Sequence, residues 1–270
     1  QALGCLGSTS VLTTGATLPD PKDGLDDLRL IQGASELARR GEQRAAIERL
    51  ESAISRNPRF TDAIANLAML YDDLGEFEKS AATYKKAIEA NPTNAAGPAA
   101  SLGWLYLRQG KFDEAEAHAK IALSTYPAYG HLLLGRIALA RGDLQNAGAY
   151  AQKCMSDPSY RIAGMVLMAQ VLSRSGRAAE ALPLLDRAKR ERLAEGGDPE
   201  QLLAFARGDA LARLNRAEEA EVAFREETRL FPQDPEAWAH LAVVCLLQGK
   251  TKEAEQVMES LVRAVPRRES

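Results

Sequence analysis

Metal binding and acid–base catalysis in proteins depend most often on histidine and cysteine, and this chain has few of either. There are three of each: His118, His131, His240, Cys5, Cys154 and Cys245. No two histidines have HxxxH or HExxH spacing, and no two cysteines form a CxxC pair. An odd number of widely separated cysteines also fits no disulfide framework. We therefore expect no metal site of the usual spacing.

Other catalytic patterns are missing as well. No GxGxxG or GxxxxGK[ST] loop is present to hold a phosphate group. The adjacent carboxylates Asp72-Asp73 and Glu218-Glu219 are typical of charged helix surfaces near turns. The sequence therefore predicts no catalytic residue, no cofactor and no enzymatic activity in this chain.

The composition is that of a folded chain without an unusual charge. Hydrophobic residues make up 46% of the 270 residues and charged residues 26%, a balance typical of globular domains. The net charge of -3 and the pI of about 5.8 argue against a general nucleic-acid binder. The longest uncharged stretch, residues 1–19, is too rich in Gly, Ser and Thr to span a bilayer.

A repeated pattern organises the rest of the chain. Residues 61–94 read TDAIANLAMLYDDLGEFEKSAATYKKAIEANPTN, two apolar-periodic stretches separated by Gly75 and closed by Pro92. The same frame recurs with starts at 27, 61, 96, 128, 162, 201 and 235. Its turn position holds Gly41, Gly75, Gly110, Gly142, Gly176, Asn215 and Gly249. Its second stretch opens on Ala46, Ser80, Ala115, Ala147, Ala181, Ala220 and Ala254.

This frame closely resembles the tetratricopeptide repeat. The resemblance implies an all-α fold, a right-handed superhelical solenoid of about seven helix-turn-helix repeats over residues 25–270, after a linker at 1–24. Cys154 and Cys245 fall at positions 27 and 11 of their repeats, where buried packing is expected. Residues 189–200 are extra, so we expect a longer helix that breaks near Gly196, with a hinge or a change of pitch there.

The first residues allow two interpretations. Ala2-Leu3-Gly4-Cys5 could be a lipoprotein-type cleavage site. Alternatively, residues 1–7 and Asp20-Pro21-Lys22-Asp23 resemble the segment that follows the catalytic domain of some bacterial sulfatase and alkaline-phosphatase-like proteins. That resemblance implies a C-terminal tail of a larger, exported or periplasmic hydrolase. The compartment stays open, because without this resemblance a cytoplasmic location is expected.

In the tetratricopeptide family, certain positions of each first helix point into a concave groove that binds other polypeptides. Carried over, they predict these partner-binding residues: Asn66, Met69, Asp73, Trp104, Arg108, Tyr129, Arg136, Gln170, Arg174, Phe205, Asp209 and Arg213. The arginines form a basic line and repeat two is acidic, although single charges of this kind commonly just solvate a surface. Trp104 is either an anchor for a ligand side chain or a packing residue across a narrow groove.

Chaperone-binding members of the family hold a C-terminal carboxylate at five defined positions. Here those positions carry Ile31, Ser35, Asn66, Gly97 and Ser101, of which only Asn66 matches. We therefore expect a protein-interaction scaffold of another specificity, binding a peptide or helix in the groove, with no nucleic acid and no membrane span. The alternative is a non-catalytic accessory or oligomerisation tail of a hydrolase. The last repeat has no capping helix after it, so Val257 and Leu261 could meet a second copy.

Overall fold

A computed structural model describes the backbone of residues 21–264 and the side chains of residues 29–264. Within that part the chain is helical and contains no strand, as the sequence predicts. The N-terminal segment 1–20, with most of the predicted linker and hydrolase-like motif, lies outside the described residues, as do residues 265–270. The chain divides into two compact units, Gln1–Gly110 and Lys111–Ser270.

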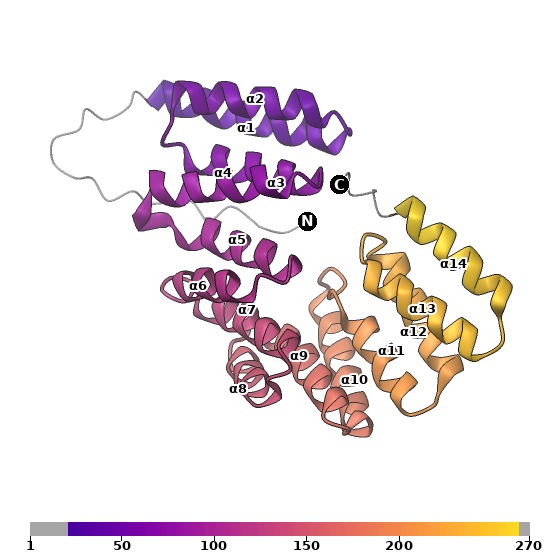
Figure 1. Ribbon diagram of the computed structural model, residues 1–270. Coiled ribbons are helices and arrows are strands. Elements are labelled where there is room, and N and C mark those ends of the chain that lie inside the picture. Colours follow the sequence, from indigo (N-terminus) through magenta and orange to yellow (C-terminus); the bar gives the residue numbers. More distant parts are fainter. Residues whose placement is uncertain (1–20, 265–270) are drawn as a thin grey trace. The chain divides into compact units, whose positions relative to one another are not determined.

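The first unit contains five α-helices and a short 3-10 helix (Figure 1). They are α1 (Pro21–Arg39), α2 (Gln43–Arg56), α3 (Thr61–Asp73), α4 (Phe77–Ala90), η1 (Pro92–Asn94) and α5 (Ala96–Arg108). Successive helices pack against one another, and α1 also contacts α3. The first helix begins at Pro21, four residues before the predicted start of the array at 25.

The second unit contains the remaining nine described helices. They are α6 (Phe112–Ala122), α7 (Pro127–Ala140), α8 (Leu144–Met155), α9 (Arg161–Arg174), α10 (Ala178–Glu195), α11 (Leu203–Arg213), α12 (Ala217–Leu230), α13 (Pro235–Leu247) and α14 (Thr251–Ala264). The boundary between the units falls inside the third repeat. The predicted hinge near 189–200 is therefore not where the chain divides.

The turn inside each repeat has the backbone conformation that its residue type predicts. All seven predicted turn residues have positive φ, from 72° to 82° at the six glycines and 58° at Asn215. At six of these turns, the N–H of the following residue donates to the carbonyl five residues back, as in Glu76 to Tyr71 and Arg216 to Leu211. This Schellman arrangement satisfies carbonyl groups at the end of the first helix and reverses the chain.

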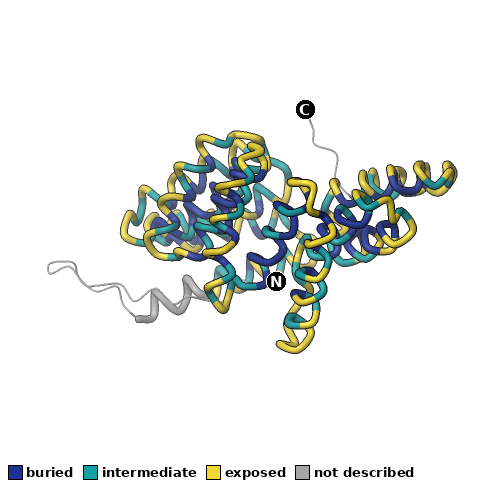
Figure 2. The backbone as a smooth tube through the Cα atoms, turned by 90° about the horizontal axis from the view of Figure 1, so that it is seen from below, coloured by how far each residue is buried: buried dark blue, intermediate teal, exposed yellow. Residues whose placement is uncertain are grey.

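Within each unit, the core lies between the two helices of a repeat and the first helix of the next repeat. The small residues that open the second helices are all buried, at no more than 3% exposure. A larger side chain at these places would hold the paired helices apart. Figure 2 shows buried segments alternating with exposed ones along the helices, and exposed segments at many turns. Cys154 and Cys245 are buried, as their repeat positions predict.

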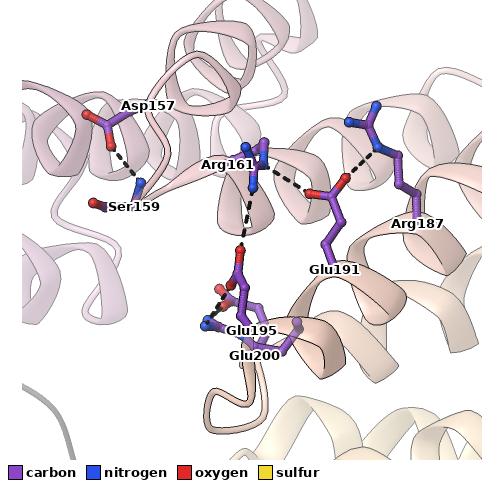
Figure 3. A network of polar contacts seen from close by, with 8 residues as sticks. Asp157, Ser159, Arg161, Arg187, Glu191, Glu195 and Glu200 are labelled. Atoms are coloured by element: carbon purple, nitrogen blue, oxygen red, sulfur yellow. Dashed lines mark hydrogen bonds and ion pairs between the residues drawn. The ribbon is translucent and has the colours of Figure 1, made fainter.

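The extra residues after the fifth repeat lengthen a helix that breaks at Gly196, as the sequence predicts. This helix is α10, which reaches 18 residues, and Gly196 is left-handed with φ 64°. Glu191 and Glu195 on the added turns both bind Arg161 at the start of α9, with nitrogen–oxygen distances of 2.9 and 3.5 Å (Figure 3). Arg187 also binds Glu191, at 2.7 Å. These ion pairs tie the extension of α10 to α9.

None of the helices in the described range combines the length and the apolar composition needed to cross a bilayer.

Candidate functional site

The first helices of the repeats in the second unit lie side by side. Helix α7 contacts α9, α9 contacts α11, and α11 contacts α13. The second helices make their extensive contacts with the first helices of their own and the following repeat. In a curved repeat array, the helices that contact the equivalent helix of the next repeat lie on the inner side of the curve. We call the exposed side of α7, α9, α11 and α13 the inner face of the second unit.

Arg136 and Gln170 meet at the junction of α7 and α9. The Arg136 Nη1 atom donates to the Gln170 Oε1 atom at 2.5 Å, and Gln170 is 8% exposed. One turn further along α9, the Arg174 Nη1 atom donates to the Leu139 carbonyl oxygen of α7 at 2.9 Å. Both predicted arginines therefore bridge the same two helices, each through a neutral acceptor.

Arg136 carries its charge in a partly desolvated place. Its residue is half-buried, and its Nε atom is buried without a hydrogen-bond partner. Burial lowers the pKa of the Arg136 guanidinium to about 10, although the carboxylates of Glu200 and Glu236 oppose the shift. The guanidinium remains protonated at neutral pH. Glu236 lies in the first turn of α13.

The C-terminal part of the inner face combines aromatic and charged residues. On α11, Phe205 meets His240 of α13 edge to face, with ring centroids 5.0 Å apart. Phe205 is 8% exposed and contributes mainly to the core, whereas His240 is exposed. Asp209 and Arg213 pair with each other one turn apart on α11, at 2.8 Å. This aspartate and arginine therefore neutralise each other.

At the N-terminal end of α7, Tyr129 is half-buried and its ring lies 5.8 Å from that of Tyr160, just before α9.

Sequence reasoning missed two residues near this end of the inner face. Glu200, in the loop before α11, pairs with Arg192 on the extension of α10. The only sequence signal for either residue is the extra segment 189–200 itself, which does not reveal where its side chains lie.

In the first unit, the predicted residues lie on α3 and α5. Met69 and Asp73 are exposed, while Asn66 and Trp104 are half-buried. Arg108 on α5 binds both carboxylate oxygens of Asp72 on α3. The predicted separation of acidic and basic charge therefore includes a direct ion pair within this unit.

A buried glutamate, also missed from the sequence, positions α11 and its inner-face residues. Glu227 on α12 is fully buried, and its carboxylate accepts hydrogen bonds from the backbone N–H groups of Leu202 and Phe205, at 2.7 and 3.1 Å. Burial raises the pKa of Glu227, and these hydrogen bonds act against the rise. Leu202 is left-handed with φ 66°, an unfavourable conformation for leucine. The carboxylate therefore acts as an N-terminal cap supplied by another helix.

One group of potential metal ligands occurs among the described residues. Glu221, Cys245 and Glu253 bring their ligand atoms within 4.8 Å of one another. However, Lys250 donates to Glu221 at 2.7 Å, and Arg225 also binds it at 2.8 Å. Two cations on the central carboxylate and a buried thiol whose pKa burial raises do not suit a divalent metal. We interpret this group as a structural ion-pair cluster.

Comparison with known families covers the same part of the chain. One tetratricopeptide-repeat family model matches residues 101–158, 166–235 and 205–269, and a second matches residues 37–102. The chain is a tetratricopeptide-repeat protein. Members of this family typically serve as non-enzymatic scaffolds for interaction with other proteins.

Individual relatives share the fold at low sequence identity. A tetratricopeptide repeat protein from Parabacteroides merdae is 19% identical with a TM-score of 0.68, over 83% of this chain and 86% of that one. PilW, a type IV pilus biogenesis factor, is 19% identical with a TM-score of 0.62, over 84% and 99%.

The human protein O-mannosyl-transferase TMTC1 is a curated relative, 25% identical over 209 residues. The alignment covers 76% of this chain but spans only 23% of that relative's length. None of the three relatives named here is a sulfatase or a phosphatase. The hydrolase-tail hypothesis therefore has no support from them.

Proposed function

We propose that this tetratricopeptide-repeat array binds a peptide or helical segment of a partner protein on its inner face and has no catalytic activity of its own. The main support is the arrangement of α7, α9, α11 and α13, which forms one continuous surface. That surface carries aromatic, cationic and amide side chains at repeat positions outside the interhelical core. Such a preorganised surface favours binding because little order is lost on association.

In the second unit, the proposed contacts are Tyr129, Arg136, Gln170, Arg174 and the exposed parts of α11 and α13. Val243 on α13 is 53% exposed and adds apolar area beside the aromatic cluster. Apolar anchors would supply most of the binding energy, and the charged groups would select the partner and its orientation. Asp209 and Arg213 would contact the partner only by replacing their mutual ion pair with ion pairs to charged groups of the partner.

In the first unit, we propose a separate contact surface on α3 and α5. It comprises Asn66, Met69, Asp73 and Trp104, with Arg108 held by its ion pair to α3. Met69 is 43% exposed, which leaves an apolar side chain available for contact. This surface is testable independently through Met69→Asp.

Selection of peptides on the complete chain tests the proposal. A displayed library of random 12-residue peptides would be enriched on the wild-type protein, and the selected peptides measured by fluorescence anisotropy. We expect Val243→Asp to weaken the peptides at least about tenfold, because a charge would replace an apolar contact. The matched control is Val222→Asp, on the second helix α12, where the valine is 69% exposed. Equal effects of both substitutions, or no enriched peptide, would refute the proposal.

Self-association through the last repeat is a further proposal about partners. Met258 on α14 is 45% exposed, whereas residues at the same repeat position, Leu50, Leu185 and Phe224, are at most 1% exposed. In those repeats the position is covered by a neighbouring first helix. We propose that a second copy covers this face. Analytical ultracentrifugation should detect dimers of the wild-type chain, and Met258→Glu should abolish them. A wild-type chain that stays monomeric at about 100 μM would exclude this self-association.

A further inference from the structure

Two arginines on the inner face of the second unit have no carboxylate partner among the described residues. Arg136 bonds only the amide oxygen of Gln170, and Arg174 bonds only the carbonyl oxygen of Leu139. The other two arginines of the predicted basic line each pair with an aspartate. The α7–α9 junction of the inner face therefore carries two guanidinium groups whose charge is not matched by a direct contact.

An unmatched cation in a desolvated place is costly for a folded protein. Arg136 is such a case, because its Nε atom is buried without a partner and no described residue accepts a hydrogen bond from Nη2. A neutral methionine or leucine would fill the α7–α9 junction at lower cost. A guanidinium retained there has donors available for an anionic ligand.

The surrounding charges indicate what kind of anion fits. Arg174 lies one helical turn after Gln170 on α9, so both arginines reach the α7–α9 junction from neighbouring positions. Glu236 and Glu200 lie within electrostatic range of Arg136, and Glu200 is already neutralised by Arg192. Two cations against one unpaired carboxylate leave a single excess positive charge. A singly charged carboxylate balances it, whereas a phosphate dianion would meet repulsion from Glu236.

We propose that Arg136 and Arg174 together bind one carboxylate of a partner peptide, with Gln170 holding Arg136 in place. This inference rests on the proposed function, because it assumes that a peptide lies on the inner face. The carboxylate comes from an aspartate or glutamate side chain or from a chain terminus. Bidentate contacts with two guanidinium groups make the site selective for carboxylate over amide.

The peptides selected on the wild-type chain provide the probes. We expect them to share an acidic position, and changing that residue to its amide should weaken binding about 10- to 100-fold, the range for hydrogen bonds to charged groups. Arg136→Met combined with Arg174→Gln should remove this preference. Arg187→Gln, which changes an exposed arginine on α10, is the control that should leave it intact. Synthetic peptides with free and amidated C-termini distinguish a terminal carboxylate from a side chain, and phosphoserine in the acidic position should bind more weakly.

The possible results separate this inference from the proposed function. Failure to select any inner-face peptide would remove the proposed function itself. Peptides that bind the inner face without an acidic residue, or keep their acid preference in the double variant, would refute only the arginine site. A purely structural role predicts that Arg136→Met lowers the thermal unfolding temperature. We expect that temperature to be unchanged or higher, because the substitution removes an unmatched buried charge.

Discussion

Replacing Glu227 by glutamine should destabilise the second unit, although the two side chains have nearly the same shape. The carboxylate accepts hydrogen bonds from the Leu202 and Phe205 N–H groups, at 2.7 and 3.1 Å, in a fully buried place. Hydrogen bonds to charged groups contribute about 1.5–3 kcal/mol each. Glutamine retains one acceptor but turns an amide NH₂ group toward the second N–H donor.

The expected net change is smaller than the sum of both hydrogen bonds. Burial raises the pKa of Glu227, so removing its charge recovers part of the desolvation cost. We expect a loss of about 2 kcal/mol, roughly one charge-assisted hydrogen bond, and a decrease of about 4–8 °C in unfolding temperature. The left-handed Leu202 should also relax once its N–H group is released.

Urea unfolding followed by circular dichroism measures the total effect, and hydrogen exchange at residues 202–206 measures the local one. Local exchange is needed because repeat arrays do not always unfold in one step. The matched control is Glu226→Gln, which changes the adjacent residue of α12. Glu226 binds Lys189 at 2.7 Å in a partly exposed ion pair, so its loss should cost at most about 0.5 kcal/mol. Equal costs for the two substitutions, with unchanged exchange at 202–206, would refute the capping role of Glu227.

Other substitutions test the packing, the ion-pair cluster and the turns. Gly164→Ala should cost about 1–3 kcal/mol, because a Cβ atom there would lie 2.7 Å from a backbone nitrogen of α8. Gly148→Ala is the control, because the nearest atom to its added Cβ would be 3.8 Å away. Helix propensity should make this variant more stable by up to about 1 kcal/mol. Equal losses of stability for the two variants in urea unfolding would contradict the close packing at Gly164. Burial alone raises the pKa of Glu221, but hydrogen bonds from Lys250, Arg225 and Gln248 hold that pKa at about 2, below its ordinary 4.5. The stabilisation that the Glu221 carboxylate contributes is therefore complete above pH 4.5 and is lost as the pH falls toward 2. Lys250→Met should reduce this acid-dependent loss of stability in acid unfolding curves. Identical curves for the variant and the wild type would exclude the ion-pair contribution. Asn215 has a left-handed backbone with φ 58°, which valine adopts with difficulty and glycine adopts freely. Asn215→Val should therefore cost about 1–2 kcal/mol of stability in thermal unfolding, and Asn215→Gly should be tolerated. An equally stable valine variant would contradict this turn geometry.

Sequence reasoning predicted the repeat starts closely, because each depends on local features. The predicted starts at 61, 96 and 235 are also the first residues of α3, α5 and α13. The turn glycines and the small residues that open the second helices were predicted for the same reason. Each is required by the geometry of one repeat, so its residue type alone carries the information.

The pairing of the inner-face arginines was not predictable in this way. Repeat positions give Arg136, Arg174 and Arg213 similar expectations, yet the first two bond neutral acceptors across two helices and the third binds Asp209 on its own helix. Phe205 was predicted as a partner contact but is largely buried in the core. Which of these side chains meets a neighbour depends on the packing of successive repeats.

The sequence by itself therefore determined the helical repeat, its turns and its buried small residues, because these follow from hydrophobic periodicity and local backbone conformation. The tertiary structure decided which charges are neutralised between helices, since such an ion pair requires side chains from two helices to approach within a few ångströms. It also revealed that Glu227 caps a helix 22 residues earlier in the chain through the Phe205 N–H group. Long-range contacts of this kind leave no periodic signal in the sequence, because they depend on the relative placement of whole helices.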